Sequence, residues 1–185
     1  MVRSIVDEPK KQELYWRQVV GVDNIDYTQV YSLNIVKISD RKIAEFNFKV
    51  LHCILPCGVN LKKWKQKDNA NCDICNVEES IEHLLYYCNY ANNFWKELSN
   101  IIGWKICLKH VIYGIMGDEA STFIISLIAY LIYKEWLINS FANRCQTGYP
   151  SIDHFRSDLI YRANVYRQLK WNKICMILDK ILTAL

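Results

Sequence analysis

Apolar residues recur at helical spacing along most of the chain, and the clearest case lies between Asp40 and Leu55. One apolar row holds Ile43, Phe46, Val50 and Ile54, the next holds Ala44, Phe48, Leu51 and Leu55, and Lys42, Glu45, Lys49 and His52 line the polar side. This pattern predicts an amphipathic helix that buries a wide face. Asp40 is its expected N-cap, and Pro56 and Gly58 mark its expected end.

Periodic apolar positions predict further helices at 9–20, 59–66, 89–102, 118–143, 151–169 and 171–185. The 26–36 stretch suits a helix or an extended segment, and 104–108 suits a short extended piece. In the first helix, Leu14 and Trp16 are expected to make apolar contacts. Residues 123–131 are apolar almost all round, so we expect the 118–143 helix to be central, with Phe123, Leu127 and Leu131 buried. The predicted fold class is mainly α, a compact helical domain.

Composition indicates how this domain is organised. Six Gly and three Pro in 185 residues leave little room for a linker. We therefore expect one domain, 1–185, in which 101–185 packs on the same core as the rest. Residues 1–10 lack the apolar stretch of a signal peptide, and the longest uncharged run, 120–133, is too short to span a bilayer. These features predict an intracellular protein, nuclear or cytoplasmic, with no membrane partner.

Cysteine usage points to a metal. Eight cysteines without a secretory signal favour metal ligation over disulfides. Four soft ligands, Cys72, Cys75, His83 and Cys88, form the array C-x2-C-x7-H-x4-C. A C-x2-C pair directs both sulfurs at one ion, and Zn²⁺ takes thiolate and imidazole ligands tetrahedrally. The array predicts a CCHC zinc knuckle embedded at 68–90, with Zn²⁺ as the cofactor.

The residues around the array predict how it folds. Asn76 tolerates the left-handed conformation that a tight turn often demands. Glu78 to Ser80 mark a helix start, which places His83 on the first turn. Cys88 lies off the face of a regular helix carrying His83, so this helix should end or bend near Tyr87.

Two other interpretations of the cysteines remain open. In the first, the cysteines of the array are merely core residues and His83 is an incidental neighbour. In the second, Cys53 and Cys57 join Cys72 and Cys75 in a four-cysteine site. Cys53 lies in a strongly helical stretch and Pro56 precedes Cys57, so this pair lacks the turn chemistry of the other pair.

Five short motifs can be compared with known families: Phe48-Lys49-Val50-Leu51-His52-x-Ile54-Leu55-Pro56, Cys72-x2-Cys75, Glu79-Ser80-Ile81-Glu82-His83-Leu84, Cys88-x-Tyr90-Ala91 and Phe94-Trp95. Together they resemble the reverse-transcriptase zinc-binding domain at the C-terminal end of LINE-type non-LTR retrotransposon polyproteins. The resemblance covers residues 40–100 and carries the family's ligands over to the four residues of the array. It implies binding of RNA or target DNA, in aid of reverse transcription carried out elsewhere in the polyprotein, and makes that reverse transcriptase a candidate partner.

Charge is distributed unevenly around the array. Residues 37–67 hold eight basic and two acidic side chains, whereas 68–100 hold one basic and six acidic ones. Because phosphate contacts need Lys or Arg, the flank and not the knuckle is the candidate nucleic-acid site. The most basic stretch holds Lys62, Lys63, Trp64, Lys65 and Lys67. Its lysines suit phosphate contacts, and Trp64 suits base stacking.

The same stretch has a plainer interpretation, a solvated helix end with Trp64 in the core. Lys49 and His52 join the candidate nucleic-acid residues because the family pattern recurs at Lys49-x-x-His52, although a mere surface role suits them equally. Ile74, Tyr86 and Tyr87 are further candidates for base contact.

Catalytic chemistry is not expected. The chain has no Asp-Asp pair for catalytic Mg²⁺, no Gly-rich phosphate loop and no nucleophile motif, and His110 and His154 stand alone. Four strong ligands close the zinc site, whereas catalytic zinc keeps one position open. The sequence therefore predicts a non-enzymatic zinc-knuckle module that binds single-stranded RNA or DNA. The alternative is a protein-interaction scaffold stabilised by structural zinc.

Overall fold

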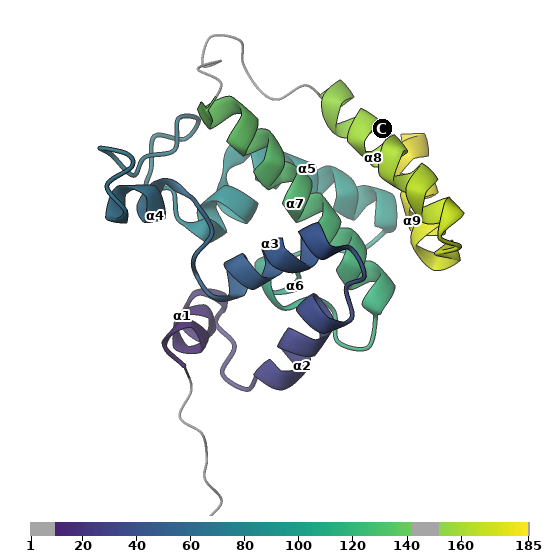
Figure 1. The fold of residues 1–185 in the computed structure, drawn as a ribbon, viewed down its shortest axis with the longest axis horizontal. Coiled ribbons are helices and arrows are strands. Elements are labelled where there is room, and N and C mark those ends of the chain that lie inside the picture. Colours follow the sequence, from purple (N-terminus) through teal and green to yellow (C-terminus); the bar gives the residue numbers. More distant parts are fainter. Residues whose placement is uncertain (1–9, 142–151, 185) are drawn as a thin grey trace, which may run out of the picture.

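The computed structural model describes residues 10–141 and 152–184, and helices dominate this part of the chain (Figure 1). Their bounds are α1 Lys11–Val20, α2 Tyr27–Tyr31, η1 Ser32–Val36, α3 Arg41–Leu51, α4 Gly58–Lys63, η2 His83–Tyr87, α5 Asn89–Ile102, α6 Leu108–Tyr113, α7 Glu119–Phe141, α8 Ile152–Gln168 and α9 Asn172–Ala184. The segments η1 and η2 are π-helical. Over the described residues there is no strand, and the mainly α prediction is confirmed.

Helix α7 runs through the middle of the molecule, with α3 and α6 against it and α8 and α9 along one edge (Figure 1). Asp118 caps it as predicted, because its carboxylate accepts hydrogen bonds from the Ser121 backbone and hydroxyl. Phe123, Leu127 and Leu131 are all buried, as predicted. By length and composition alone, Glu119–Ile138 could cross a membrane, but 67% of that window is buried, as in a core helix.

Helix α3 begins as predicted but ends earlier. The Asp40 side chain accepts from the backbone nitrogens of Lys42 and Ile43. The helix stops at Leu51 because Cys53 takes a left-handed conformation with φ 57°. The amides of Cys53 and Ile54 then bond back to the carbonyls of Val50 and Lys49, the pattern of a Schellman cap. Glycine usually holds that position, so this end could not be predicted from the sequence.

Some sequence-based assignments were wrong at single residues. Phe48 and Ile54 were expected in the buried face of α3, yet both are exposed. Because α3 ends at Leu51, Ile54 no longer lies on its apolar face. Leu14 is also exposed. The 26–36 stretch is helical, as α2 followed by η1.

The segment after Trp104 also differs from prediction, since it leads into a helix, α6, that was not expected. Cys107 and His110 form its N-terminal cap, in which the Cys107 backbone N–H donates to the His110 ring. Neither residue is a usual cap, which is why the sequence did not reveal the helix. The proposed start at Pro9, the boundaries near Asn143 and Ser151 and the His154 side chain lie outside the described residues.

Asp40 also joins distant parts of the chain. Its Oδ1 caps α3, while its Oδ2 accepts from the Arg162 guanidinium of α8 at 2.9 Å and from the Tyr166 hydroxyl at 3.1 Å. A continuous cluster of buried side chains extends from Trp16 in α1 to Ile181 in α9. The metal array is therefore attached to a rigid helical body.

Candidate metal centre

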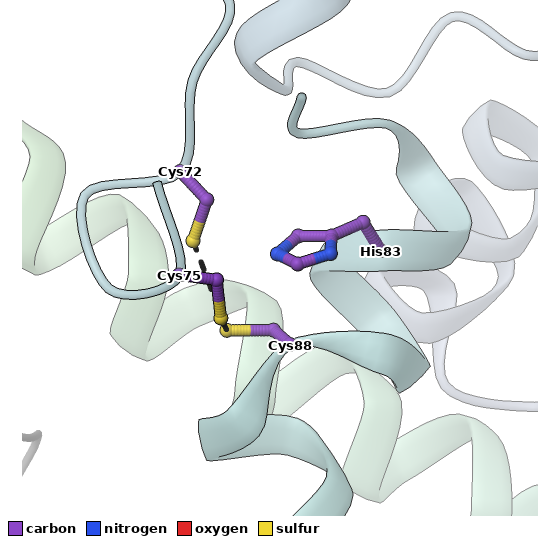
Figure 2. Close-up of side chains that lie close together, drawn as sticks. All are labelled: Cys72, Cys75, His83 and Cys88. Atoms are coloured by element: carbon purple, nitrogen blue, oxygen red, sulfur yellow. Dashed lines mark hydrogen bonds between the residues drawn. The ribbon is translucent and has the colours of Figure 1, made fainter. Parts of the chain in front are cut away.

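A short hairpin carries the first two cysteines. Within residues 70–79, which we call the metal hairpin, the Cys72 amide donates to the Val77 carbonyl at 2.8 Å, and Asn71 and Glu78 form an isolated antiparallel bridge. Asn76 closes the turn with φ 54°, as predicted from its tolerance of this conformation. This turn places Cys72 and Cys75 beside each other, pointing to one side (Figure 2).

The other two candidate ligands come from a widened helical turn. Ser80 caps the helix, since its hydroxyl accepts from the His83 amide at 3.3 Å, and the helix ends at Tyr87, as predicted. Its last turn is π-helical, with the Cys88 amide bonded to the His83 carbonyl at 2.6 Å. A π-turn joins residues five apart, so it brings Cys88 under His83, which a regular helix would not do.

The four side chains converge on one point. Their candidate ligand atoms all lie within 4.8 Å of one another. The Cys88 sulfur is 3.9 Å from that of Cys72 and 3.8 Å from that of Cys75 (Figure 2). Tetrahedral zinc with Zn–S bonds of ~2.3 Å requires sulfur–sulfur distances of about 3.8 Å. The cage therefore has the size that zinc needs.

The chemistry of the donors also suits a metal. The Nε2 atom of His83 is buried and has no hydrogen-bond partner among the described residues, so it is an orphaned ligand. The Cys88 thiol lowers the pKa of Cys72 to about 4, and the same contact raises the pKa of Cys88. A divalent ion bound here would stabilise all three sulfurs as thiolates and cross-link the hairpin to η2.

Cys53 and Cys57 do not belong to this cage. Among the described residues, the group that could hold a metal consists only of Cys72, Cys75, His83 and Cys88. Burial raises the pKa of Cys53 to about 12 and that of Cys57 to about 11, so both are neutral thiols at physiological pH. The four-cysteine alternative therefore has no support in the structure.

Glu79 joins the metal hairpin to the helices, a role that the sequence did not reveal. It is 2% exposed, and its carboxylate accepts from the Gly58 amide at 2.8 Å and from the Trp136 indole at 2.9 Å. Its own amide donates to the Ala70 carbonyl, and its carbonyl accepts from Val59. Burial raises the pKa of its carboxyl to about 7. One side chain thus fixes the hairpin to both α4 and α7.

The basic segment, residues 62–67, begins in the last turn of α4. Lys62 and Lys63 are exposed on its last turn, Lys65 follows with φ 59°, and Trp64 is 41% exposed. The interpretation that Trp64 is buried in the core is therefore wrong. Lys67 differs from the others, because it donates to the Asn71 carbonyl at 3.2 Å and lies 3.8 Å from the Asp73 carboxylate.

The remaining candidates for nucleic-acid contact are distributed over two faces. Lys49 pairs with Glu45 at 2.7 Å on the exposed side of α3, and the His52 ring stacks on Phe48. Ile74 and Tyr87 are exposed beside the metal centre. Tyr86 is held into the fold, since its hydroxyl donates to the Ile106 carbonyl at 3.2 Å.

Fold and ligand set together define a helical protein with a closed metal site of three cysteines and one histidine. Residues 23–95 match the family described as zinc-binding in reverse transcriptase. This match and the four-ligand cluster confirm the resemblance of this region to a reverse-transcriptase zinc-binding domain. The family and the ligand cluster indicate a bound metal. No curated protein and no solved structure matches the chain significantly.

Proposed function

We propose that the chain is a zinc-stabilised nucleic-acid-binding module of a LINE-type non-LTR retrotransposon reverse transcriptase, accessory to reverse transcription, and that its target is single-stranded RNA or DNA. The observation that carries this proposal is the exposure of Trp64 among Lys62, Lys63 and Lys65, a few residues before the metal hairpin in the chain. An exposed aromatic among lysines is the combination by which single strands are held without sequence preference.

In this proposal the metal has a structural role. Zinc would be held by Cys72, Cys75, His83 and Cys88, and four protein ligands leave no open position for a substrate. The ion cross-links the hairpin to η2, and Glu79 transmits that rigidity to the start of α4 through its bond to Gly58. The lysines at the end of α4 are then presented in a fixed arrangement.

Binding itself falls to the lysine side chains. Lys62, Lys63 and Lys65 are exposed with no ion-pair partner among the described residues, so their ammonium groups are available to phosphates. Lys67 is partly engaged by Asp73, which limits its contribution. Trp64 supplies a ring face on which an unpaired base stacks.

A second function is favoured by a different observation. Ile74, Val77 and Tyr87 are all exposed apolar side chains near the metal centre, within the acidic part of the chain. Such a surface suits docking onto a protein, for example the polymerase part of the same polyprotein. In that case the zinc and the helical core serve as a scaffold.

Binding of a labelled single strand over a salt series separates the two functions. Replacing Lys62, Lys63, Lys65 and Lys67 by Gln should weaken binding to RNA and DNA of any sequence. Each lost contact removes ~0.7 from the slope of log affinity against log salt, so the slope should fall by about 2 to 3.

A matched control removes the same charge elsewhere. Replacing the exposed Lys105, Lys109, Lys170 and Lys173 by Gln should leave most of the affinity and the slope intact. Equal effects of the two quadruple variants would mean that binding follows net charge and not the basic segment. No binding by the wild-type protein at low salt would favour the docking scaffold.

A further inference from the structure

Three aromatic rings form a row on the surface at the ends of α2 and α3. The Phe48 and His52 rings are stacked, with centroids 3.9 Å apart and planes 26° apart. The His52 ring in turn lies 5.6 Å from the ring of Tyr31, tilted by 36°. Phe48 is 41% exposed, although the spacing of apolar residues along α3 would place it in the core. We call Phe48, His52 and Tyr31 the ring row.

Backbone contacts hold the ring row in place. Phe48 and His52 are four residues apart, so they are neighbours on the helix surface. A carbonyl only accepts, so the His52 Nδ1 donates to the Phe48 carbonyl at 2.9 Å and fixes the imidazole against the phenyl ring. The left-handed turn at Cys53 ends the helix directly after His52. Because the rings are already ordered, little conformational entropy is lost when a ligand binds.

Positive charge accompanies the ring row. The Lys10 ammonium lies 5.9 Å from the Tyr31 ring centroid, and the partly exposed Lys49 follows Phe48 in α3. The nearby acid Glu45 is paired with Lys49 at 2.7 Å. Flat rings beside ammonium groups match the two parts of a nucleotide, a base to stack and a phosphate to neutralise.

The ring row is joined to the basic segment by a rigid connection. The Asn60 side chain of α4 donates to the carbonyl of Cys53 at 3.1 Å and to that of Leu55 at 2.7 Å. These bonds fix α4, with Lys62 and Lys63 at its end, to the chain that leaves the ring row. The ring row and the basic segment therefore keep a fixed position relative to each other.

We propose that the ring row is a stacking site for unpaired bases of a single-stranded nucleic acid, separate from Trp64. This inference rests on the proposed function, which supplies the strand. It adds a site where bases, and not only phosphates, are bound. Phe48 contributes the most exposed ring, and His52 and Tyr31 extend the surface.

Phe48→Ala tests the proposal, with two labelled strands of equal length as probes: oligothymidylate and the same sugar-phosphate chain made abasic. The variant should bind oligothymidylate about 5- to 100-fold more weakly, which is the loss typical of one stacked base. Binding to the abasic strand and the salt slope should not change, because the lysines remain. Phe48→Tyr, which keeps the ring, should bind like wild type.

Two controls separate a binding effect from a folding effect. Tyr161→Ala removes a ring that is 69% exposed on α8 and should leave both affinities unchanged. If Phe48→Ala lowers the Tm, then Phe48→Leu, which keeps the apolar bulk and loses the flat ring, replaces it in the comparison. Loss of oligothymidylate affinity in a variant with wild-type Tm supports the ring row.

The outcomes also separate this inference from the function on which it rests. If wild-type protein binds oligothymidylate with a steep salt slope but Phe48→Ala binds it equally well, the ring row is not a stacking site and the basic-segment proposal stands. If both strands lose affinity equally in Phe48→Ala, the ring acts on the fold or on phosphate binding and the stacking site is refuted. If wild-type protein binds neither strand at low salt, both proposals fail.

Discussion

Gly58→Ala tests how the metal hairpin is joined to the basic helix. A Cβ at this position would lie 2.4 Å from the Ala70 carbonyl oxygen and 2.9 Å from the Glu79 Cβ. The Ala70 oxygen cannot retreat freely, because it accepts the Glu79 amide across the hairpin at 2.8 Å. Relief therefore requires α4 and the hairpin to separate, which would also stretch the bond from the Gly58 amide to the Glu79 carboxylate.

The magnitude follows from these two effects. Overpacking of a close contact costs about 1 to 3 kcal/mol, and weakening a hydrogen bond to a buried charged group costs about 1.5 to 3 kcal/mol. We expect the free energy of unfolding of the zinc-loaded protein to fall by ~2.5 to 6 kcal/mol. If ~2 kcal/mol of this loss falls on the metal-bound hairpin, zinc affinity drops about 30-fold.

Two measurements check this expectation: urea unfolding of the zinc-loaded protein, and competition for zinc against a chromogenic chelator. Gly21→Ala is the matched control, because Gly21 has φ 72° and nothing within 4 Å of its added Cβ. That change should cost ~1 to 2 kcal/mol through backbone strain alone and should leave zinc affinity unchanged. Wild-type zinc affinity in Gly58→Ala would refute the coupling between the hairpin and α4.

Three further changes have distinct expected outcomes. Cys75→Ser removes one thiolate and should lower zinc occupancy in native mass spectrometry while the helical circular dichroism persists. Burial raises the pKa of Glu79 from 4.5 to about 7, so its contribution to stability is complete below pH 4.5 and is lost as the pH rises through 7. Wild-type stability should therefore fall by ~2 kcal/mol more than that of Glu79→Gln between pH 5.5 and 8 in urea unfolding, and equal falls would contradict this. Leu127→Ala, at a fully buried site of α7, should lower the free energy of unfolding by ~2 to 5 kcal/mol in the same assay.

The sequence predicted the metal centre well because the information is local. The spacing of Cys72, Cys75, His83 and Cys88 lies within one short window, and Asn76 and Ser80 provide the turn and the helix cap where they were expected. The long apolar run of α7 was equally clear, since a helix that is apolar all round has to be buried.

The features that the sequence did not predict are of two kinds. Some depend on contacts between distant segments, and others place an unusual residue type at a helix end or cap. The α3 helix ends at a left-handed cysteine, and α6 is capped by Cys107 and His110, so the usual glycine and serine signals are missing. Glu79 resembles any acidic residue at a helix start until Gly58 and Trp136 are seen to donate to it. The exposure of Phe48 also departs from the apolar pattern of α3, which predicted this residue in the buried face.

The acidic character of the metal hairpin is consistent with a structural role, in which the metal site stabilises a nearby binding surface but does not itself contact the ligand. With zinc bound, three thiolates and one neutral imidazole leave a net charge of −1 at the centre, and Asp73 adds to it, so a phosphate would be repelled there. Lys62 and Lys63 lie outside the hairpin, in the last turn of α4, and the start of that helix is fixed to the hairpin by Glu79. Zinc would then act on nucleic-acid binding through the position of the lysines. Under the proposed function, losing the metal should displace these charges, whereas the quadruple Gln variant removes them.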